Sequence, residues 1–254
     1  MGKNKLKKFA ELESLECVLQ YPRERLVSEG FPYKGHWNRE VFLSEYPIVL
    51  ELGCGKGEYT TALADACKTK NFIGIDIKGA RVWKGAKEVT EKGLQNARFL
   101  RTEIENLSQF FGPDEIDEIL ITFPDPQMQK TRKRLTSTRF LKQYAAMLKP
   151  EGVVNLKTDS PFLYEYTRRL VYLNGLTVLE DTDDLYGSGK ADPVSSIKTF
   201  YESQWLSRGK SIKLLSFRLK RDIELEEPST DDIPKDNYHA FTRHNPSLNA
   251  AKDL

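Results

Sequence analysis

The chain has 254 residues, of which 39% are hydrophobic and 30% charged, with 39 Lys and Arg against 37 Asp and Glu and a formal net charge of +2. This length can bury a sizeable core in one large domain. The balanced charge excludes a strongly basic, histone-like binder but is compatible with a local basic face. No run of 18 apolar residues is present, so we expect no membrane span.

The N-terminus is basic but lacks the uninterrupted apolar run of a signal peptide. Three cysteines and three histidines are too scattered for a disulfide framework or a metal site: Cys17, Cys54, Cys67, His36, His239 and His244. We therefore expect no metal and a cytoplasmic location.

Residues 1–46 are expected to form an N-terminal extension, with a helix at about 5–20 and an aromatic loop at 31–37. This loop can act as a lid, but packing against the sheet is the favoured interpretation.

Residues 47–220 are expected to form the main domain. Its expected strands are 48–52, 72–75, 98–101, 116–123 and 153–156, with two further edge strands at 176–179 and 211–219. Its expected helices are 58–67, 79–93, 136–148 and 162–173. This alternation predicts an α/β fold with a doubly wound, mostly parallel sheet and helices on both faces.

Residues 221–254 are expected to be a polar tail, disordered or ordered only on contact. They hold four basic and eight acidic side chains, a net charge of −4, which leaves +6 for residues 1–220. The near-zero net charge therefore combines a moderately basic body with an acidic tail.

A glycine-rich loop, Glu51-Leu52-Gly53-Cys54-Gly55-Lys56-Gly57, closes the first strand of the main domain and leads into a helix. Glycines there let the backbone approach a ligand closely. The spacing is GxGxG, and Glu58 stands where a dinucleotide site has its third glycine. A carboxylate there would repel a pyrophosphate at the helix N-terminus, and no P-loop lysine motif follows. Pyrophosphate binding is therefore disfavoured.

A ligand with a ribose, an adenine and no phosphate fits better, and S-adenosylmethionine is such a ligand. Asp76 can accept hydrogen bonds from its ribose hydroxyls, Glu103 can lie near its adenine, and Glu51 can engage its amino-acid portion. Taken singly, each acid could instead be a surface or helix-capping residue. Acids after successive strands favour the cofactor site, with Gly53 and Gly55 in its loop.

The fourth strand ends in Thr122-Phe123-Pro124-Asp125-Pro126, followed by a Lys/Arg-rich stretch at 127–135. At this point the sequence resembles the tRNA (guanine-N7)-methyltransferase family, whose members carry a strand-ending PDP tripeptide before a basic stretch. Three more elements are similar, in the family's order over residues 47–219: the glycine loop, Lys157-Thr158-Asp159, and Thr199-Phe200-Tyr201-Glu202.

The resemblance implies a Rossmann-like methyltransferase sheet and methyl transfer from S-adenosylmethionine to N7 of guanosine 46 in the variable loop of tRNA. It implies cofactor contacts by four acids: Glu51, Asp76, Glu103 and Asp125, the last also catalytic. It implies substrate contacts by Lys130, Asp159, Thr199 and Glu202.

The chain departs from the family's pattern after the PDP motif. Gln127-Met128 stands where Trp-Pro or Trp-His is common, and the basic stretch is about one residue shorter. The family's substrate-contacting lysine therefore falls at Gln129 without a gap, or at Lys130 with one, and we favour Lys130.

Six basic side chains and no acid lie between residues 127 and 142: Lys130, Arg132, Lys133, Arg134, Arg139 and Lys142. Such a run is often a solvated face, but its place after Asp125 predicts a track for the tRNA backbone. No obligate protein partner is evident. Two alternatives stay open: a methyltransferase for a small molecule or protein, and a non-catalytic RNA-binding subunit of the same fold.

Overall fold

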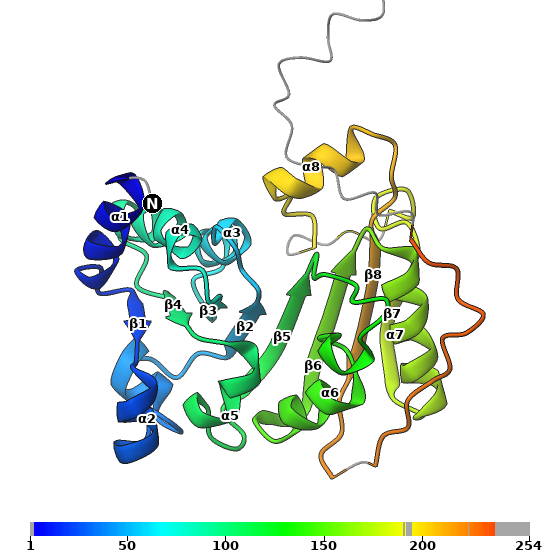
Figure 1. Cartoon of the computed structure of the whole chain (residues 1–254), viewed down its shortest axis with the longest axis horizontal. Helices are drawn as coiled ribbons and strands as arrows, with labels where there is room; N and C mark the ends of the chain where they lie inside the picture. The colour runs from blue at the N-terminus through cyan, green and yellow to red at the C-terminus, as the bar shows by residue number, and fades with distance from the viewer. Residues whose placement is uncertain (1–2, 190, 192–194, 223, 237–254) are drawn as a thin grey trace, which may run out of the picture.

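The computed structural model describes residues 3–189, 191, 195–222 and 224–236. Within them, an eight-stranded sheet runs in the order β1-β4-β3-β2-β5-β6-β8-β7 (Figure 1). Its strands are β1 (Val18–Gln20), β2 (Ile48–Leu52), β3 (Asn71–Ile75), β4 (Ala97–Arg101), β5 (Ile116–Thr122), β6 (Leu148–Thr158), β7 (Thr177–Thr182) and β8 (Lys213–Arg218). The first six are parallel, and β8 is antiparallel to both β6 and β7. The predicted mostly parallel sheet is confirmed.

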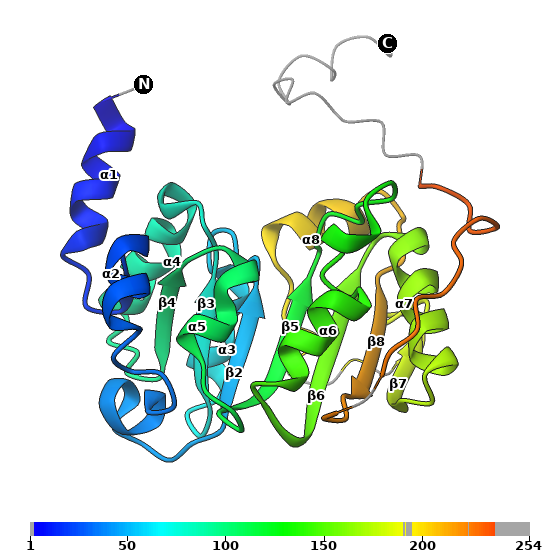
Figure 2. The same ribbon diagram turned by 60° about the horizontal axis from the view of Figure 1, so that its bottom comes forward.

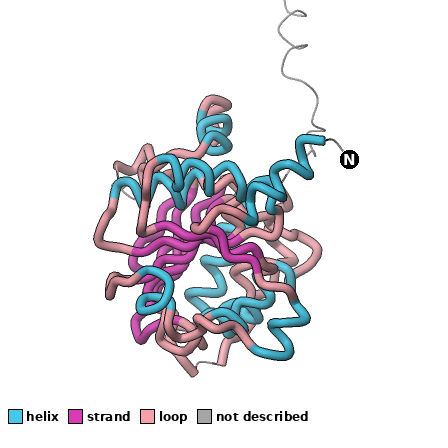
Figure 3. Tube along the Cα trace, turned by 90° about the vertical axis from the view of Figure 1, so that its left-hand side faces the viewer, coloured by secondary structure: helices cyan, strands magenta, loops and turns pink. Residues whose placement is uncertain are grey.

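Helices cover both faces of this sheet, as Figures 2 and 3 show. One face carries α1 (Lys3–Glu13), α3 (Glu58–Ala66) and α4 (Gly79–Glu91), and the other carries α2 (Arg23–Glu29), α5 (Leu107–Phe110), α6 (Thr138–Ala145) and α7 (Pro161–Leu173). A last helix, α8 (Phe200–Leu206), lies above the carboxyl end of β5 (Figure 1). Short turns of π- and 3-10 helix occupy Trp37–Phe42, Ile104–Asn106 and Thr131–Lys133.

The central strand β2 shows why the sheet is buried on both sides. All five of its residues are buried, as expected for a parallel strand covered by helices on each face. Leu50 and Leu52 pack in the cluster that contains Phe140 of α6, whereas Val49 packs with Leu63 of α3. Because side chains alternate along a strand, Glu51 points to the α3 side, where the glycine loop lies.

The N-terminal extension differs from the prediction in one respect. The expected helix at 5–20 ends at Glu13, and Val18–Gln20 instead forms strand β1, parallel to β4. The free edge of β4 offers backbone hydrogen bonds, such as the one from the Phe99 N–H to the Cys17 carbonyl at 2.7 Å. This long-range pairing outweighs local helix propensity. The aromatic loop packs inward: Phe31 and Trp37 are buried in the cluster that also contains Leu50 and Ile73 of the sheet.

The expected tail is partly ordered. Leu225 and Ile233 are buried in the main core, and Asp236 accepts a hydrogen bond from the Phe162 N–H at the start of α7. Leu225 and Ile233 hold this acidic segment against the core that includes α6 and α7. Residues 224–236 are therefore ordered by these contacts. The rest of the predicted tail, 237–254, lies outside the described residues.

Candidate functional site

The glycine loop after β2 is bent by three glycines with positive φ: Gly53 at 74°, Gly55 at 58° and Gly57 at 70°. The Gly53 and Cys54 N–H groups donate to the Ile75 carbonyl at 2.8 and 2.9 Å, which ties the loop to the end of β3. A Cβ on Gly57 would lie 2.6 Å from the Phe99 ring. Gly57 therefore allows the close packing of α3 that a third glycine provides in dinucleotide sites.

Glu51 is the buried acid of this loop, with 4% of its surface exposed. Its carboxylate accepts hydrogen bonds from the Thr60 N–H (2.8 Å), the Thr60 hydroxyl and the Thr122 hydroxyl (2.9 Å). Burial raises the pKa of Glu51 to about 7, although these hydrogen bonds oppose the rise. The carboxyl can therefore change its charge near neutral pH and pair with a cation brought by a ligand.

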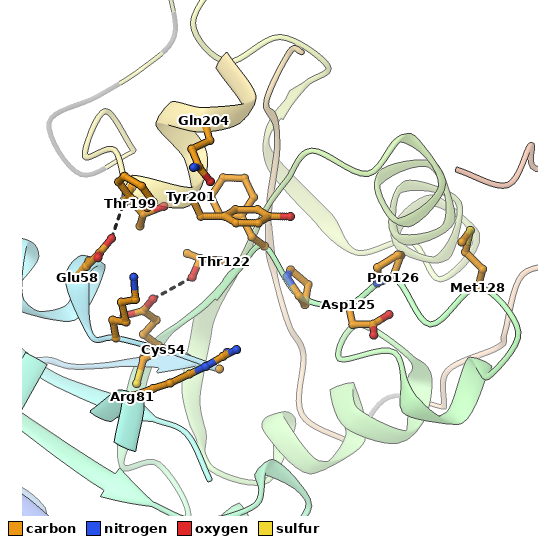
Figure 4. Close-up of a pocket in the computed structure, with 17 residues that line it drawn as sticks. Cys54, Glu58, Arg81, Thr122, Asp125, Pro126, Met128, Thr199, Tyr201 and Gln204 are labelled. Atoms are coloured by element: carbon orange, nitrogen blue, oxygen red, sulfur yellow. Dashed lines mark hydrogen bonds between the residues drawn. The ribbon is translucent and has the colours of Figure 1, made fainter. Parts of the chain in front are cut away.

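A cavity of about 710 Å³ lies between the glycine loop, the loop after β5 and the start of α8 (Figure 4). In this view Tyr201 lies above the cavity and Arg81 below it. Its polar and aromatic lining comes from these three segments and from the first turns of α3 and α4, and includes Glu51, Lys56, Glu58, Arg81, Thr122, Asp125, Thr199, Phe200, Tyr201 and Gln204. Its volume lies in the range of cavities that hold small-molecule ligands.

Asp125 lines this cavity from the loop after β5, with its side chain exposed. Its carboxylate accepts a hydrogen bond from the Gln127 N–H at 2.9 Å. Phe123 and Gln127, on either side of it, have positive φ values of 48° and 46°. Non-glycine residues in this region cost about 1 kcal/mol or more each. The chain therefore maintains a strained loop around its candidate catalytic acid.

The other two predicted cofactor acids also follow strands. Both oxygens of Asp76 accept backbone hydrogen bonds, from the Gly55 N–H (2.9 Å) and the Lys78 N–H (2.7 Å). Glu103 lines a second cavity of about 940 Å³, beside Ile77 and Arg101. Since the sheet order is β4-β3-β2-β5, the four acids follow four adjacent parallel strands: Glu103, Asp76, Glu51 and Asp125.

Helix α8 is tied to the start of α3 across the cavity. Glu58 accepts a hydrogen bond from the Phe200 N–H at 2.9 Å and pairs with Lys84 at 3.2 Å. Partial burial acts to raise the pKa of Glu58, but this hydrogen bond and Lys84 outweigh it, so the pKa is lowered. Glu58, which stands where a dinucleotide site has its third glycine, therefore links the start of α3 to the start of α8 across the cavity.

Two predicted substrate residues shape α8 itself. Thr199 caps the helix by accepting a hydrogen bond from the Glu202 N–H at 3.1 Å, while its own side chain lines the cavity. Glu202 is fully buried and pairs with Lys157 at 2.8 Å, and the Tyr186 hydroxyl donates to it at 2.6 Å. The Glu202 carboxylate is thus buried beside Lys157 and does not line the cavity.

The remaining two predicted substrate residues differ in their exposure to solvent. Asp159 is 5% exposed, and Lys130 is exposed in the turn after Asp125. In the basic stretch Arg132 and Lys133 are exposed, but Arg134 is 1% exposed. The basic stretch is therefore not uniformly exposed, because the Arg134 side chain packs on aromatic rings of α7.

Several residues at the site were not singled out from the sequence. Lys157 and Tyr186 surround Glu202, and Arg81 lines the cavity. Lys157 could have been identified from the sequence, because a charged residue at the end of a buried strand needs a partner. Nothing in the sequence distinguishes Arg81 from the other basic residues around the start of α4.

In the part of the chain that the structure describes, no group of three His, Cys, Asp or Glu could hold a metal ion. Over the same residues, no helix combines the length and apolar character needed to cross a bilayer.

Residues 45–215 match a family described as "Putative methyltransferase". Two solved structures share the fold at 16% identity: the 16S rRNA methyltransferase KamB (TM-score 0.56, 74% of this chain and 94% of that one) and an antibiotic-related methyltransferase (TM-score 0.55, 80% and 96%).

Relatives of higher identity match almost the whole chain. The tRNA (guanine-N(7)-)-methyltransferase of Porphyromonas gingivalis is 53% identical over 236 residues, which cover 91% of this chain and 96% of the relative. That of Bacteroides thetaiotaomicron is 49% identical over 243 residues, covering 96% of each. With its Rossmann-like sheet and strand-end acids, the chain belongs to the tRNA (guanine-N7-)-methyltransferase family.

Proposed function

We propose that this protein transfers the methyl group of S-adenosylmethionine to N7 of guanosine 46 in the variable loop of tRNA. The observation that carries the proposal is the row of acids after four adjacent strands, of which Glu51 and Asp125 line one cavity. Membership of the family supplies the reaction class. A tRNA substrate would place the activity in the cytoplasm.

The residues present fit the cofactor. No atom lies within 4 Å of a Cβ built on Gly53, and on Gly55 only the Gly53 carbonyl does, so a ligand can approach this backbone. Glu51, with its raised pKa, would pair with the ammonium group of the cofactor. Asp76 would accept from the ribose, and Glu103 would lie toward the adenine. When bound, S-adenosylmethionine supplies an electrophilic methyl group on a sulfonium.

The chemistry asks for alignment more than for acid–base groups. Guanine N7 has an in-plane lone pair at neutral pH, so no proton need be removed before it attacks the methyl carbon. Methylation leaves positive charge on the imidazole ring, which the exposed Asp125 carboxylate would stabilise. The protein's contribution is to hold N7, the methyl carbon and sulfur in line.

The cavity mouth is suited to a base turned out of an RNA strand. Phe200 and Tyr201 are 61% and 41% exposed at the start of α8, where their rings can stack on a base. Lys130, Arg132 and Lys133 lie exposed in the turn after Asp125 and would contact the phosphate backbone. Of the other proposed substrate residues, Thr199 lines the cavity, whereas Asp159 and Glu202 would support it from below the surface.

The proposal is tested by incubating the protein with bulk tRNA and labelled S-adenosylmethionine, followed by nucleoside analysis. We expect 7-methylguanosine, and no labelled product from a tRNA transcript in which guanosine 46 is replaced by adenosine. Label in protein or in a small molecule, but not in tRNA, would instead indicate a methyltransferase that acts on those substrates. Failure to bind S-adenosylmethionine by calorimetry would favour a non-catalytic RNA-binding subunit.

A further inference from the structure

Arg134 is a buried cation within a basic surface stretch. It is 1% exposed, although Arg132 and Lys133 beside it are exposed. Among the described residues it forms no ion pair with a carboxylate. Its guanidinium lies over the rings of Phe162 and Tyr166 in α7, 4.9 and 4.4 Å from their centroids. Burying a charge is costly, so contacts of this kind must offset a large desolvation penalty.

The hydrogen bonds of Arg134 point back toward the candidate catalytic acid. Its Nε donates to the Gln127 carbonyl at 3.2 Å and its Nη2 to the Met128 carbonyl at 2.8 Å. Gln127 in turn donates its N–H to the Asp125 carboxylate at 2.9 Å and has a positive φ of 46°. Arg134 is thus one hydrogen-bonded residue away from Asp125, and it braces the strained turn that carries this acid.

The aromatic side of this arrangement is itself fixed by the segment after β8. The Tyr166 hydroxyl donates to Glu227 at 2.6 Å, and the other oxygen of Glu227 accepts from the Thr138 N–H at 2.9 Å and from its hydroxyl at 2.8 Å. Glu227 therefore joins the start of α6 to α7 and fixes the ring on which Arg134 rests. The acidic segment 224–236 therefore supports Arg134 indirectly, by fixing the Tyr166 ring.

We propose that Arg134 is a positioning residue for methyl transfer, which holds the turn 125–128 so that Asp125 faces the cavity, and that it is not an RNA contact. The inference rests on the proposed function of Asp125. It departs from the sequence pattern, in which Arg134 is one more member of a phosphate-binding run. A planar guanidinium can reach two carbonyls while stacking on rings, whereas the single ammonium of lysine cannot reproduce this fork.

The decisive variant is Arg134→Lys, because it keeps the positive charge and removes the fork. If Arg134 only places Asp125, kcat should fall about 10- to 100-fold, since small misplacements at a reacting centre have effects of this size. KM for tRNA, its dependence on salt and the affinity for S-adenosylmethionine should each stay within about 2-fold. The contrasting variant is Lys133→Gln, a proposed phosphate contact, whose main effect should be a raised KM for tRNA with a weaker salt dependence.

A second variant covers the case in which Arg134→Lys lowers the melting temperature and the affinity for S-adenosylmethionine. Phe162→Leu keeps Arg134 and an apolar side chain but removes one ring from beneath the guanidinium. We expect kcat to fall about 3-fold or more, with KM for tRNA unchanged.

The outcomes separate the two proposals. An Arg134→Lys protein that is folded and keeps wild-type kcat, or that shows a raised KM and reduced salt dependence like Lys133→Gln, would overturn the positioning role. Wild-type kinetics for Phe162→Leu would also overturn it if Arg134→Lys is unstable. A wild-type protein that makes no 7-methylguanosine would instead overturn the proposed function.

Discussion

The Thr122 hydroxyl donates a 2.9 Å hydrogen bond to the Glu51 carboxylate, joining the carboxyl ends of β2 and β5. Glu51 belongs to the glycine loop, and Thr122 directly precedes the turn that carries Asp125. This hydrogen bond therefore links the strand end proposed to hold the cofactor to the strand end that leads into the turn of Asp125. The protonation of Glu51 is the property through which this link is most easily tested.

Affinity for S-adenosylmethionine should rise with pH. Because the pKa of Glu51 is raised to about 7, the carboxyl is mostly neutral at pH 6 and mostly ionised at pH 8. An ammonium ligand binds the ionised form, so we expect affinity to increase roughly 10-fold over this interval. Titration calorimetry of the wild type and Glu51→Gln measures it. The variant should bind weakly with a flat profile, and a flat wild-type profile would argue against the ammonium contact.

The stability of the ligand-free protein should change with pH in the opposite sense. A folded pKa above the ordinary 4.5 means that folding favours the protonated acid. This contribution is fully present below pH 4.5 and is lost as pH rises through about 7, for a total of roughly 3 kcal/mol. Urea unfolding at pH 5 and pH 8 should therefore show a smaller loss of stability in Glu51→Gln than in the wild type.

Replacement of Asp125 should remove activity without unfolding the protein. Its exposed side chain has a hydrogen bond to the Gln127 N–H in the turn. We expect Asp125→Ala to lower 7-methylguanosine formation at least 100-fold by loss of charge stabilisation, with unfolding free energy within about 1 kcal/mol of the wild type. Asp125→Asn should retain the turn and still lack the charge. Wild-type turnover in either variant would refute the catalytic assignment.

Replacing Gly57 or Gly53 by alanine gives two matched variants whose unfolding free energies can be compared. Both have positive φ, but a Cβ on Gly57 would meet Phe99 at 2.6 Å, whereas nothing lies within 4 Å of one on Gly53. Gly57→Ala should lower the unfolding free energy by about 2–4 kcal/mol through overpacking and strain, and Gly53→Ala by about 1 kcal/mol through strain alone. Chemical denaturation without ligand compares the two, and equal losses would contradict the packing role of Gly57.

Glu202 should behave as the partner of a buried cation. Its removal leaves Lys157 uncompensated, so we expect Glu202→Ala to lower the unfolding free energy by about 3–5 kcal/mol. The pair Lys157→Met with Glu202→Leu should recover most of that loss, since neither charge then remains. If Glu202→Ala loses activity at unchanged stability, the direct substrate contact expected from the sequence is supported instead.

Local signals in the sequence were sufficient for the core of the fold. Apart from Glu51, the run Ile48–Leu52 is apolar, as expected for a central parallel strand covered on both faces, and the glycines after it mark the turn. The strand β1 was missed because Val18–Gln20 gains its stability from pairing with β4, far away in the chain. For the segment 224–236 the sequence left order on contact and disorder open, because Leu225 and Ile233 are buried only by distant helices.

The candidate site divides in the same way. By itself the sequence determined which acids follow which strands, and parallel topology then brings Glu103, Asp76, Glu51 and Asp125 to one edge of the sheet. It did not separate Arg134 from Arg132, nor the buried Glu202 from the cavity-lining Thr199. Residue type and spacing fix what chemistry is available, but burial and partners depend on contacts between remote segments. Only the tertiary structure decided which charges meet a ligand and which hold the site in place.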